Sequence, residues 1–396
     1  MAEREQAVPD VLPDTLPGTL PETALDILPV TSRQHLNAFI RCPQTLYRDD
    51  PAWVAPLEIE QRSRFAPDSH YASHARWQAW TAHHGGCVVG RISAQIDQLE
   101  PQAGLGYFGM LEADSESTLR QLLATACDWL RDQGMQRVRG PLNLHINDEV
   151  GLLVSGFETP PSVMMGHARP WYGDALEAAG FVGVRELLAY RIRPDFDAPR
   201  VMTRLVRHAA PRVTVRTLRR RQLMAEADTL REIFNDAWAD NWGFVPLDAD
   251  EWRHTVSSLA KLLPADYLQI AEVDGEPVAF IVALPNINEA ARDLNGRLLP
   301  FGWAKLLWRL KVRHPQSARV PLMGVKQAFQ HSRLGPALAF MVIDAVRRPL
   351  HARGVTEVEM SWILEDNDGM RNIIETIGGE AYKRYRVYEK DLKKDL

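Results

Sequence analysis

The order of apolar runs and glycines between Arg319 and Gly379 constrains the fold of this chain more than any other feature. The run ARVPLMGV is mostly β-branched or apolar, which suits a buried strand, and helical periodicity begins at Gly335. A second run, VTEVEMSWIL, leads into acidic residues and then into a helix that ends at Gly378-Gly379. The segment is therefore predicted to form strand, loop, helix, strand and helix in that order.

The turn that opens the first of these helices is a candidate anion site. A helix N-terminus leaves backbone N–H groups unpaired and carries a partial positive charge, so it favours phosphate groups. The expected cradle comprises Ser332, Arg333, Leu334, Gly335, Pro336 and Ala337.

This order of elements resembles the acyl-CoA-binding half of the GCN5-related N-acetyltransferase (GNAT) fold, in which a glycine-rich loop holds the pyrophosphate of coenzyme A. The last helix also resembles that family's pattern of an asparagine, an apolar residue three positions on and a glycine eleven on, met by Asn367, Met370 and Gly378. The resemblance implies that the cofactor also contacts the end of the preceding strand and the asparagine, at Met323, Gly324, Val325 and Asn367.

Two positions depart from the family pattern. Ser332 stands where the loop usually has glutamine or arginine, and Ile374 stands where many members carry a tyrosine that protonates the departing thiolate. The resemblance therefore implies the fold more firmly than it implies the usual proton donor.

Length and composition favour two globular domains. The chain has 396 residues, of which 45% are hydrophobic and 24% are charged, and its net charge of -5 gives no reason to expect nucleic acid as a partner. The 3 cysteines are too few and too scattered for a disulfide framework or a zinc site, so we expect no metal and a reducing cytoplasm. The sequence shows neither an apolar run of about 20 residues nor a signal peptide.

The first half repeats the second in outline. Residues 1–30 are predicted to be a disordered, proline-rich leader, and residues 33–48 a short amphipathic helix. A hairpin about His83-His84-Gly85-Gly86, a strand GLGYFGMLEAD, a helix capped by Ser115, a strand RVRGPLN and a helix follow. Where the strand GLGYFGMLEAD meets the helix capped by Ser115, the carboxylates of Glu112, Asp114 and Glu116 would repel a pyrophosphate.

We therefore expect an α/β (α+β) protein with two tandem GNAT-like domains. Each would have a mixed, mostly antiparallel sheet flanked by helices. The predicted boundaries are 31–192 for a degenerate N-terminal domain, 193–214 for a linker and first strand, and 215–396 for the acyl-CoA-binding domain.

The polar stretch PLNLHINDEVGLL at 141–153 leaves two interpretations open. Dense polar groups in a loop are typical of a substrate contact, but asparagine and aspartate also tie down their own backbone. Whether His145 is a base is not decided by the sequence.

Two segments of the second half are candidates for the acceptor side. Asn241, Trp242 and Phe244 lie in a break between two predicted helices, where they would either wall the acceptor site or pack in the core. An insertion at 286–317 carries Trp303, Leu306, Leu307 and Leu310 at helical spacing among basic residues. Such a helix could lie at a membrane surface, line an apolar channel, or simply pack on the sheet.

From about Arg33 to Glu389 the chain is also similar to a bacterial family of tandem GNAT-like proteins, through strings such as GYFGMLEAD, NWGFVP, LLPFGW, SWILEDN and YKRYRVYEK. Some members of that group are N-acyltransferases of bacterial sphingolipid synthesis that make ceramides. The resemblance implies an acyltransferase that is either free in the cytoplasm or bound peripherally to the inner face of the membrane. Its donor would be acyl-CoA or acyl carrier protein, and its acceptor a primary amine such as a long-chain sphingoid base.

The implied chemistry is direct attack of an amine on a thioester. It requires a base, for which Glu365 is the candidate, although an acid at that place also caps a helix. It requires an oxyanion donor, expected from an N–H near Gly324 or Val325. It also requires a proton for the thiolate, from Tyr385, Tyr388 or water.

Two rival functions remain at this stage. One is a Fem-type aminoacyl transferase that uses charged tRNA, against which the lack of a basic stripe argues. The other is a non-catalytic module that binds acyl-CoA as a sensor, which the missing tyrosine favours.

Overall fold

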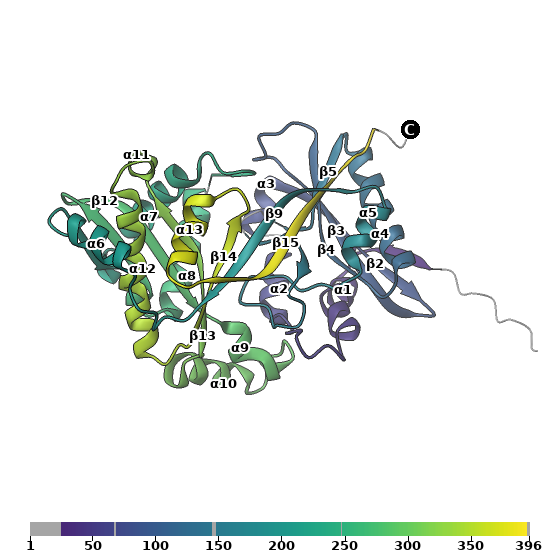
Figure 1. Cartoon of the computed structure of the whole chain (residues 1–396). Helices are drawn as coiled ribbons and strands as arrows, with labels where there is room; N and C mark the ends of the chain where they lie inside the picture. The colour runs from purple at the N-terminus through teal and green to yellow at the C-terminus, as the bar shows by residue number, and fades with distance from the viewer. Residues whose placement is uncertain (1–24, 67–68, 145–147, 247, 394–396) are drawn as a thin grey trace, which may run out of the picture.

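The computed structural model of the protein describes residues 25–66, 69–144, 148–246 and 248–393 (Figure 1). Within these ranges one mixed sheet of 13 strands runs through the molecule in the order β1-β2-β3-β4-β5-β15-β9-β14-β13-β12-β11-β10, with β8 paired to β15. Helices cover the sheet, which confirms the predicted α/β class.

The first half of the chain supplies one end of this sheet. Its main strands are β1 (Asp26–Pro29), β2 (Ala75–His84), β3 (Cys87–Asp97), β4 (Leu105–Ala113), β5 (Arg137–Gly140) and β9 (Val182–Ile192). Short strands β6 (Leu142–Asn143), β7 (Glu149–Val150) and β8 (Leu152–Ser155) follow β5. The helices are α1 (Arg33–Leu46), α2 (Glu58–Arg64), α3 (His70–His74), α4 (Glu116–Asp132) and α5 (Tyr172–Ala178).

The second half supplies the other end with the same succession of strands. These are β10 (Val213–Thr217), β11 (Leu268–Val273), β12 (Glu276–Pro285), β13 (Ser317–Val325), β14 (Glu357–Leu364) and β15 (Glu380–Asp391). Its helices are α6 (Arg200–Ala209), α7 (Leu223–Trp238), α8 (Ala249–Leu262), α9 (Ile287–Ala291), α10 (Gly302–Trp308), α11 (Gln327–Gln330), α12 (Gly335–Ala352) and α13 (Asp368–Thr376). Residues 309–313 continue α10 as a π-helical turn.

The two halves exchange their last strands. β15, the end of the second half, pairs with β5 of the first half, and β9, the end of the first half, pairs with β14 of the second. β9 and β15 also pair with each other, so they lie side by side at the centre of the molecule (Figure 1). The boundaries 31–192, 193–214 and 215–396 thus stay a proposal, because residues 380–391 complete the sheet of the first half.

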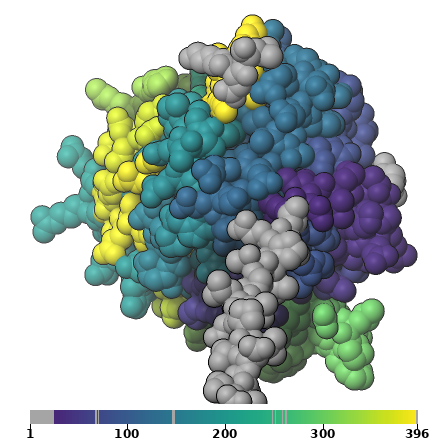
Figure 2. All heavy atoms as spheres, turned by 90° about the vertical axis from the view of Figure 1, so that its right-hand side faces the viewer, coloured from purple at the N-terminus to yellow at the C-terminus, as the bar shows by residue number. Residues whose placement is uncertain are grey.

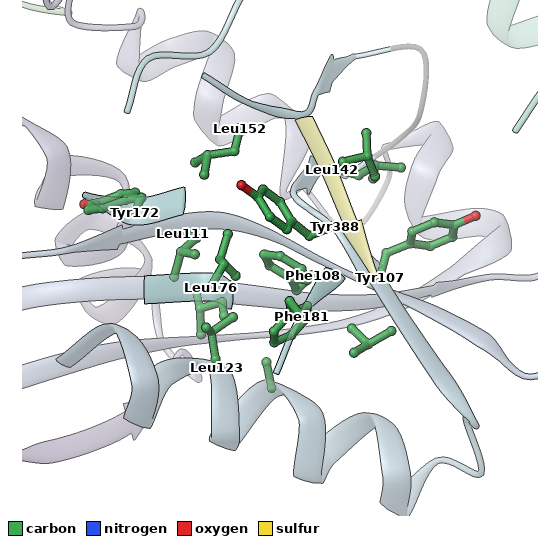
Figure 3. Close-up of a cluster of buried hydrophobic side chains, with 14 of the residues drawn as sticks. Tyr107, Phe108, Leu111, Leu123, Leu142, Leu152, Tyr172, Leu176, Phe181 and Tyr388 are labelled. Carbon is green, nitrogen blue, oxygen red and sulfur yellow. The ribbon is translucent and has the colours of Figure 1, made fainter. Parts of the chain in front are cut away.

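The exchange also mixes the two hydrophobic cores. Tyr388 on β15 is fully buried among Phe108, Leu142 and Leu152 of the first half (Figure 3). Tyr190 and Ile192 on β9 pack in turn into the core beneath α12. Neither half therefore closes its core without a strand from the other.

Most predicted elements are confirmed. The helix at 33–46, the hairpin at Gly85-Gly86, the Ser115 cap and the hairpin at Asp274-Gly275 are all present. The Ser115 hydroxyl accepts a hydrogen bond from the Thr118 N–H at 3.3 Å, as a capping residue should.

Three details differ from prediction. Residues 26–29, assigned to the leader, form the edge strand β1 along β2, where Pro29 is tolerated at the strand end; the rest of the leader lies outside the described residues. The short helix α11 lies between β13 and α12, where a single glycine turn was expected. The segment 193–214 contains the helix α6, which packs on α12.

Candidate active site

The site begins where two parallel strands of the second half separate. β13 and β14 pair only through Ser317–Val320 and Glu357–Met360. Beyond these residues β13 continues along β12, and β14 continues along β9. Pro321, which has no N–H to donate to a neighbouring strand, stands at the point of divergence. The sheet therefore opens into a wedge at the carboxyl ends of both strands.

The backbone of β13 faces this wedge with two of its amides. Lys326 donates its N–H to Val278 on β12, and N–H groups alternate sides along a strand, so the N–H of Gly324 also faces β12. Met323 and Val325 therefore point theirs into the wedge. Their carbonyls confirm this orientation, since they accept hydrogen bonds from the side chains of Trp238 and Gln330. Of the two predicted oxyanion donors, the geometry places Val325 at the wedge.

A cavity of about 770 Å³ occupies the wedge and extends to either side of it. Most of its lining side chains are apolar. The wedge itself contributes Pro321, Met323, Gly324, Val325, Ser361, Trp362, Ile363 and Leu364 to its wall.

The start of α12 opens onto the same cavity through Gly335 and Pro336. The N–H of Leu334 donates to the Ser332 hydroxyl at 3.1 Å, but no side chain caps α12 itself. Within the described part of the chain, the amides of Arg333 and Ala337 donate to no other group. The predicted anion cradle thus has free donors.

Gly335 is required at this turn by its surroundings. A Cβ there would lie 2.6 Å from the carbonyl oxygen of Phe329 and 2.7 Å from that of Gln330. Any side chain would have to displace backbone. The glycine therefore lets α11 and α12 meet closely beside the cavity.

The predicted acceptor wall also borders the cavity, and part of the first half joins it. Asn241, Trp242 and Phe244 line the cavity together with Val150 and Leu187. The guanidinium groups of Arg139 and Arg185 lie 4.7 and 5.6 Å from the Trp242 ring. The loop after α7 is thus held against the first half by cation–π contacts. Its side chains both line the cavity and pack against the protein, and their acceptor role stays a prediction.

The opposite end of the cavity was not predicted. It is lined by residues of three helices: Val201 and Leu205 on α6, Ala339 and Phe340 on α12, and Met370 and Ile373 on α13. In α13 the pair at 370 and 373 has the spacing of one helix face, a pattern that does not distinguish a cavity wall from the core. Which stripe faces a cavity depends on the packing of three helices.

Several predicted residues lie outside the cavity. Glu365 accepts a hydrogen bond from the Glu186 N–H at 3.1 Å, and its neighbours Asp366 and Asn367 line the cavity instead. Tyr385 is fully buried and donates to the Gly166 carbonyl at 3.2 Å. The roles of Glu365 as base and of Tyr385 as proton donor stay predictions, and neither side chain lines the cavity.

The other predicted residues fall at three places. Of the cradle, Ser332, Arg333, Leu334 and Ala337 adjoin the cavity without lining it. Trp303 lies on α10 and is 54% exposed.

His145 lies outside the described residues. In the stretch around it, Val150 lines the cavity while Asn143 bonds Glu149 and the Met110 N–H, so that stretch both contacts the site and ties down its own backbone.

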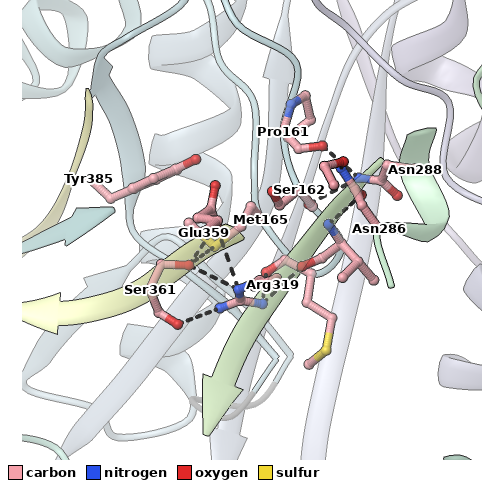
Figure 4. Close-up of polar contacts among 12 residues, drawn as sticks. Pro161, Ser162, Met165, Asn286, Asn288, Arg319, Glu359, Ser361 and Tyr385 are labelled. Carbon is pink, nitrogen blue, oxygen red and sulfur yellow. Dashed lines mark hydrogen bonds and ion pairs between the residues drawn. The ribbon is translucent and has the colours of Figure 1, made fainter. Parts of the chain in front are cut away.

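A buried polar network supports the floor of the wedge (Figure 4). The guanidinium of Arg319, fully buried, donates to the Ser361 hydroxyl at 2.9 Å and lies 4.7 Å from the Trp362 ring. Glu359 lies 3.7 Å from this guanidinium and accepts from the Ser361 hydroxyl at 2.6 Å. Arg319 also donates to the Val163 carbonyl of the first half at 2.9 Å. The network fixes Ser361 and Trp362 in the cavity wall.

A second buried cation lies beside this network. Lys383 on β15 donates to the Thr159 carbonyl at 2.7 Å. Burial lowers the pKa of its ammonium to about 8, against the opposing effect of the Glu359 charge.

Comparison with known proteins identifies the group to which the chain belongs. No family model matches it. It is 46% identical over 366 residues to protein YghO of Escherichia coli (strain K12), covering 91% of this chain and 94% of that protein. It is 44% identical over 375 residues to the bacterial ceramide synthase of Caulobacter vibrioides, covering 93% and 98%. The chain belongs to this bacterial ceramide synthase family.

Solved structures of other proteins share the fold of this chain. A tandem GNAT protein from the clavulanic acid biosynthesis pathway superposes with a TM-score of 0.54 at 14% identity, covering 93% of this chain and 99% of that one. A GCN5-related N-acetyltransferase from Sphaerobacter thermophilus gives 0.53 at 14% identity, covering 92% and 96%. The expected tandem GNAT fold is confirmed. Membership of the bacterial ceramide synthase family, and not the fold, supports the conclusion that the chain is an N-acyltransferase.

Two features are absent from the described residues. They contain no group of three or more histidine, cysteine, aspartate or glutamate side chains that could hold a metal ion. None of their helices is long and apolar enough to span a membrane.

Proposed function

We propose that this enzyme transfers a long acyl chain from a coenzyme A thioester to the primary amine of a sphingoid base, forming a ceramide. One observation carries the proposal: the wedge between β13 and β14, the start of α12 and a long apolar wall share one cavity. The name of the Caulobacter vibrioides relative supports the choice of acceptor.

The residues of the cavity fit the donor. The free amides of Arg333 and Ala337 at the start of an 18-residue helix suit the diphosphate of coenzyme A. The Met323 and Val325 amides suit the amide-rich pantetheine arm and the thioester oxygen, because they already face the space where that arm would lie. Coenzyme A, when bound, would supply the activated acyl group.

The apolar ends of the cavity fit two alkyl chains. One end is lined by Val201, Leu205, Met370 and Ile373, and the other by Val150, Leu187 and Phe244. Burying a methylene group contributes about 0.8 kcal/mol, so such walls favour long chains over acetyl groups and small amines.

Carboxylates near the wedge are the proposed proton acceptors for the amine. Glu365 is the residue expected from the sequence, but Asp366 is the neighbour that lines the cavity. Asp366 is also paired with Arg185 at 2.5 Å, which fixes its position. We propose Asp366 as the base or ammonium ligand, with Glu365 as the alternative.

The thiolate has no side-chain donor in the cavity among the described tyrosines. Ile374 is fully buried in the core, and Tyr385 and Tyr388 are buried among first-half residues. We propose that a water molecule relays to the thiolate the proton that the amine has lost to the carboxylate, so that the products are the amide and the free thiol. The same observation favours a second candidate function, an acyl-CoA sensor that binds without turnover; a Fem-type transfer is supported by no feature of the cavity.

An acyl-transfer assay tests the proposal. Purified enzyme would be incubated with palmitoyl-CoA or acetyl-CoA and with sphinganine or ethanolamine, while free thiol and the lipid amide are measured. We expect turnover with palmitoyl-CoA plus sphinganine and at least tenfold less with either short partner. Coenzyme A binding without turnover would establish the sensor instead.

The carboxylates are tested by a matched pair of variants. Asp366→Asn should lower kcat by about 100-fold, within the range of general base catalysis, while Glu365→Gln should change it less than threefold. The reverse ranking would assign the base to Glu365.

A further inference from the structure

The inserted helix presents a row of apolar side chains to solvent. Within residues 299–312, Leu299 is 82% exposed, Phe301 78% and Val312 64%, and Trp303, Leu307 and Trp308 are also exposed. No other stretch among the described residues carries as many exposed large hydrophobic side chains. We call residues 297–313 the apolar–basic patch; it projects as the green segment near residue 300 at the lower edge in Figure 2.

The apolar side chains are outward because a different face of the helix holds it in place. Leu306 and Leu310 are buried against Ala290 and Ala291 of α9. The Arg309 guanidinium further fixes the helix by donating to the Ala290 carbonyl at 2.7 Å. The predicted stripe is therefore divided: two of its leucines anchor the helix, while Trp303 and Leu307 face away from the protein.

The patch does not belong to the cavity. It precedes Ser317, the start of β13, whereas the cavity opens at the other end of that strand beyond Val320. In Figure 1, α10 lies below the lower end of β13, and α11 and α13 lie toward the top. The apolar channel considered from the sequence is thus not formed by this helix.

The charges of the patch are all positive. Residues 297–313 contain Arg297, Lys305, Arg309, Lys311 and Arg313 and no acidic residue, although the whole chain has a net charge of -5. Two acidic residues outside the patch lie beside three of these cations: Asp293 pairs with Lys305 and Arg309, and Glu58 lies 3.8 Å from Arg297. The patch therefore combines exposed aromatic and aliphatic side chains with a local positive charge.

We infer that the apolar–basic patch docks on the surface of an anionic lipid bilayer. Tryptophan and phenylalanine partition to the boundary between headgroups and acyl chains, and lysine and arginine beside them attract anionic headgroups. A second copy of the chain is a poorer occupant, since a two-fold contact would bring two basic segments together. The inference does not depend on the proposed acceptor.

Vesicle flotation tests the inference directly. The full-length protein would be mixed with vesicles of phosphatidylcholine alone or with 30 mol % phosphatidylglycerol. We expect the protein to float with the anionic vesicles only, and binding to fall as salt is raised. Phe301→Ser/Trp303→Ser/Trp308→Ser and, separately, Lys311→Glu/Arg313→Glu should each lower binding at least tenfold.

Controls separate docking from folding and from catalysis. Leu99→Ser removes a comparably exposed leucine, 46% exposed, from the turn after β3 and should bind vesicles as the wild type does. Coenzyme A binding in detergent-free buffer should be unchanged in the patch variants, which shows that they fold. Equal flotation of wild type and patch variants, or a change of the solution mass from dimer to monomer in the variants, would overturn the inference.

Discussion

Both halves of this protein contain a wedge between two parallel strands, but only one wedge is open. In the first half β4 and β5 pair through Leu105–Tyr107 and Arg137–Arg139 and then diverge, as β13 and β14 do. There the chain fills its own wedge: Asn143 accepts the Met110 N–H at 2.7 Å, and a Cβ at Gly109 would lie 1.9 Å from the Leu142 carbonyl oxygen. A backbone amide that binds its own chain is not free for a ligand.

The helix start beside the filled wedge is also occupied by side chains, whereas the helix start beside the open wedge is not. At α4 the Ser115 hydroxyl caps the helix, and Asp114 accepts a hydrogen bond from the Thr118 hydroxyl at 2.7 Å. At α12 no side chain caps the helix, and its first turn borders the cavity. Duplication of one fold thus gives one copy that suits an anion and one in which side chains and carboxylates occupy that place.

Each half also buries an arginine close to a glutamate. In the first half Arg91 lies 3.8 Å from Glu112, which accepts the Tyr47 hydroxyl at 2.7 Å. In the second half Arg319 lies 3.7 Å from Glu359. The second pair supports the open cavity, while the first lies under the filled wedge, so their removal should have different consequences.

The largest effect is expected from Arg319→Met. It leaves Glu359 buried without its cation, and breaking a buried ion pair on one side costs about 3–5 kcal/mol. Urea denaturation should show this loss of unfolding free energy. Arg319→Met/Glu359→Gln should recover at least about 1 kcal/mol, because the carboxylate that lost its guanidinium partner is then neutral. A single variant as stable as the wild type would show that the pair does not stabilise the floor of the wedge.

The pair in the first half should give a pH-dependent effect. Burial raises the pKa of Glu112 from its ordinary value to about 7. Because the folded protein then binds a proton that the unfolded chain releases, the stability contributed by this group is present below about pH 4.5 and is lost as pH rises to about 7. The loss is on the order of 3 kcal/mol. Relative to Glu112→Gln, wild-type unfolding free energy should fall over this window, and parallel profiles would contradict the assignment.

The contrast between the two helix starts is tested by introducing an aspartate into the uncapped first turn of α12. Pro336 is exposed in the first turn of α12, so Pro336→Asp should keep or strengthen the helix while repelling a diphosphate. We expect coenzyme A affinity, measured by calorimetry, to fall about 100-fold, roughly 2.7 kcal/mol. The matched variant Glu116→Lys in the first turn of α4 should leave the affinity unchanged. Equal effects of both would mean that the open helix start is not the donor site.

The smallest effect is expected from Tyr385→Phe. The change removes one buried hydrogen bond to Gly166, worth about 1 kcal/mol, from the strand exchanged between the halves. Acyl transfer should stay within threefold of wild type. A loss of kcat of about 100-fold at unchanged stability would instead support the predicted role of Tyr385 as proton donor.

Local patterns predicted much of this molecule. Gly335, Asn367 and the run ending at Val325, predicted as the donor side, do line one cavity. Turn chemistry and strand periodicity are properties of neighbours in sequence, so a sequence pattern can place these residues together. Glu365, which directly follows a strand, and Tyr385, on the last strand, were predicted from the chemistry of their side chains, yet side-chain direction decides whether such a group reaches a cavity. The pairing of β14 with β9 shifts register between Met360 and Ile363, and beyond it Glu365 accepts the Glu186 N–H while Asp366 lines the cavity.

The sequence by itself determined the elements, the duplication and the helix start that suits a phosphate, since each follows from periodicity, capping and local charge. Only the tertiary structure decided that β9 and β15 change places, that Val150 and Leu187 of the first half wall the site, and that Trp303 faces solvent. The physical reason is that strand pairing and burial depend on contacts between separate elements, more than a hundred positions apart for β9 and β15, and no local pattern records such contacts.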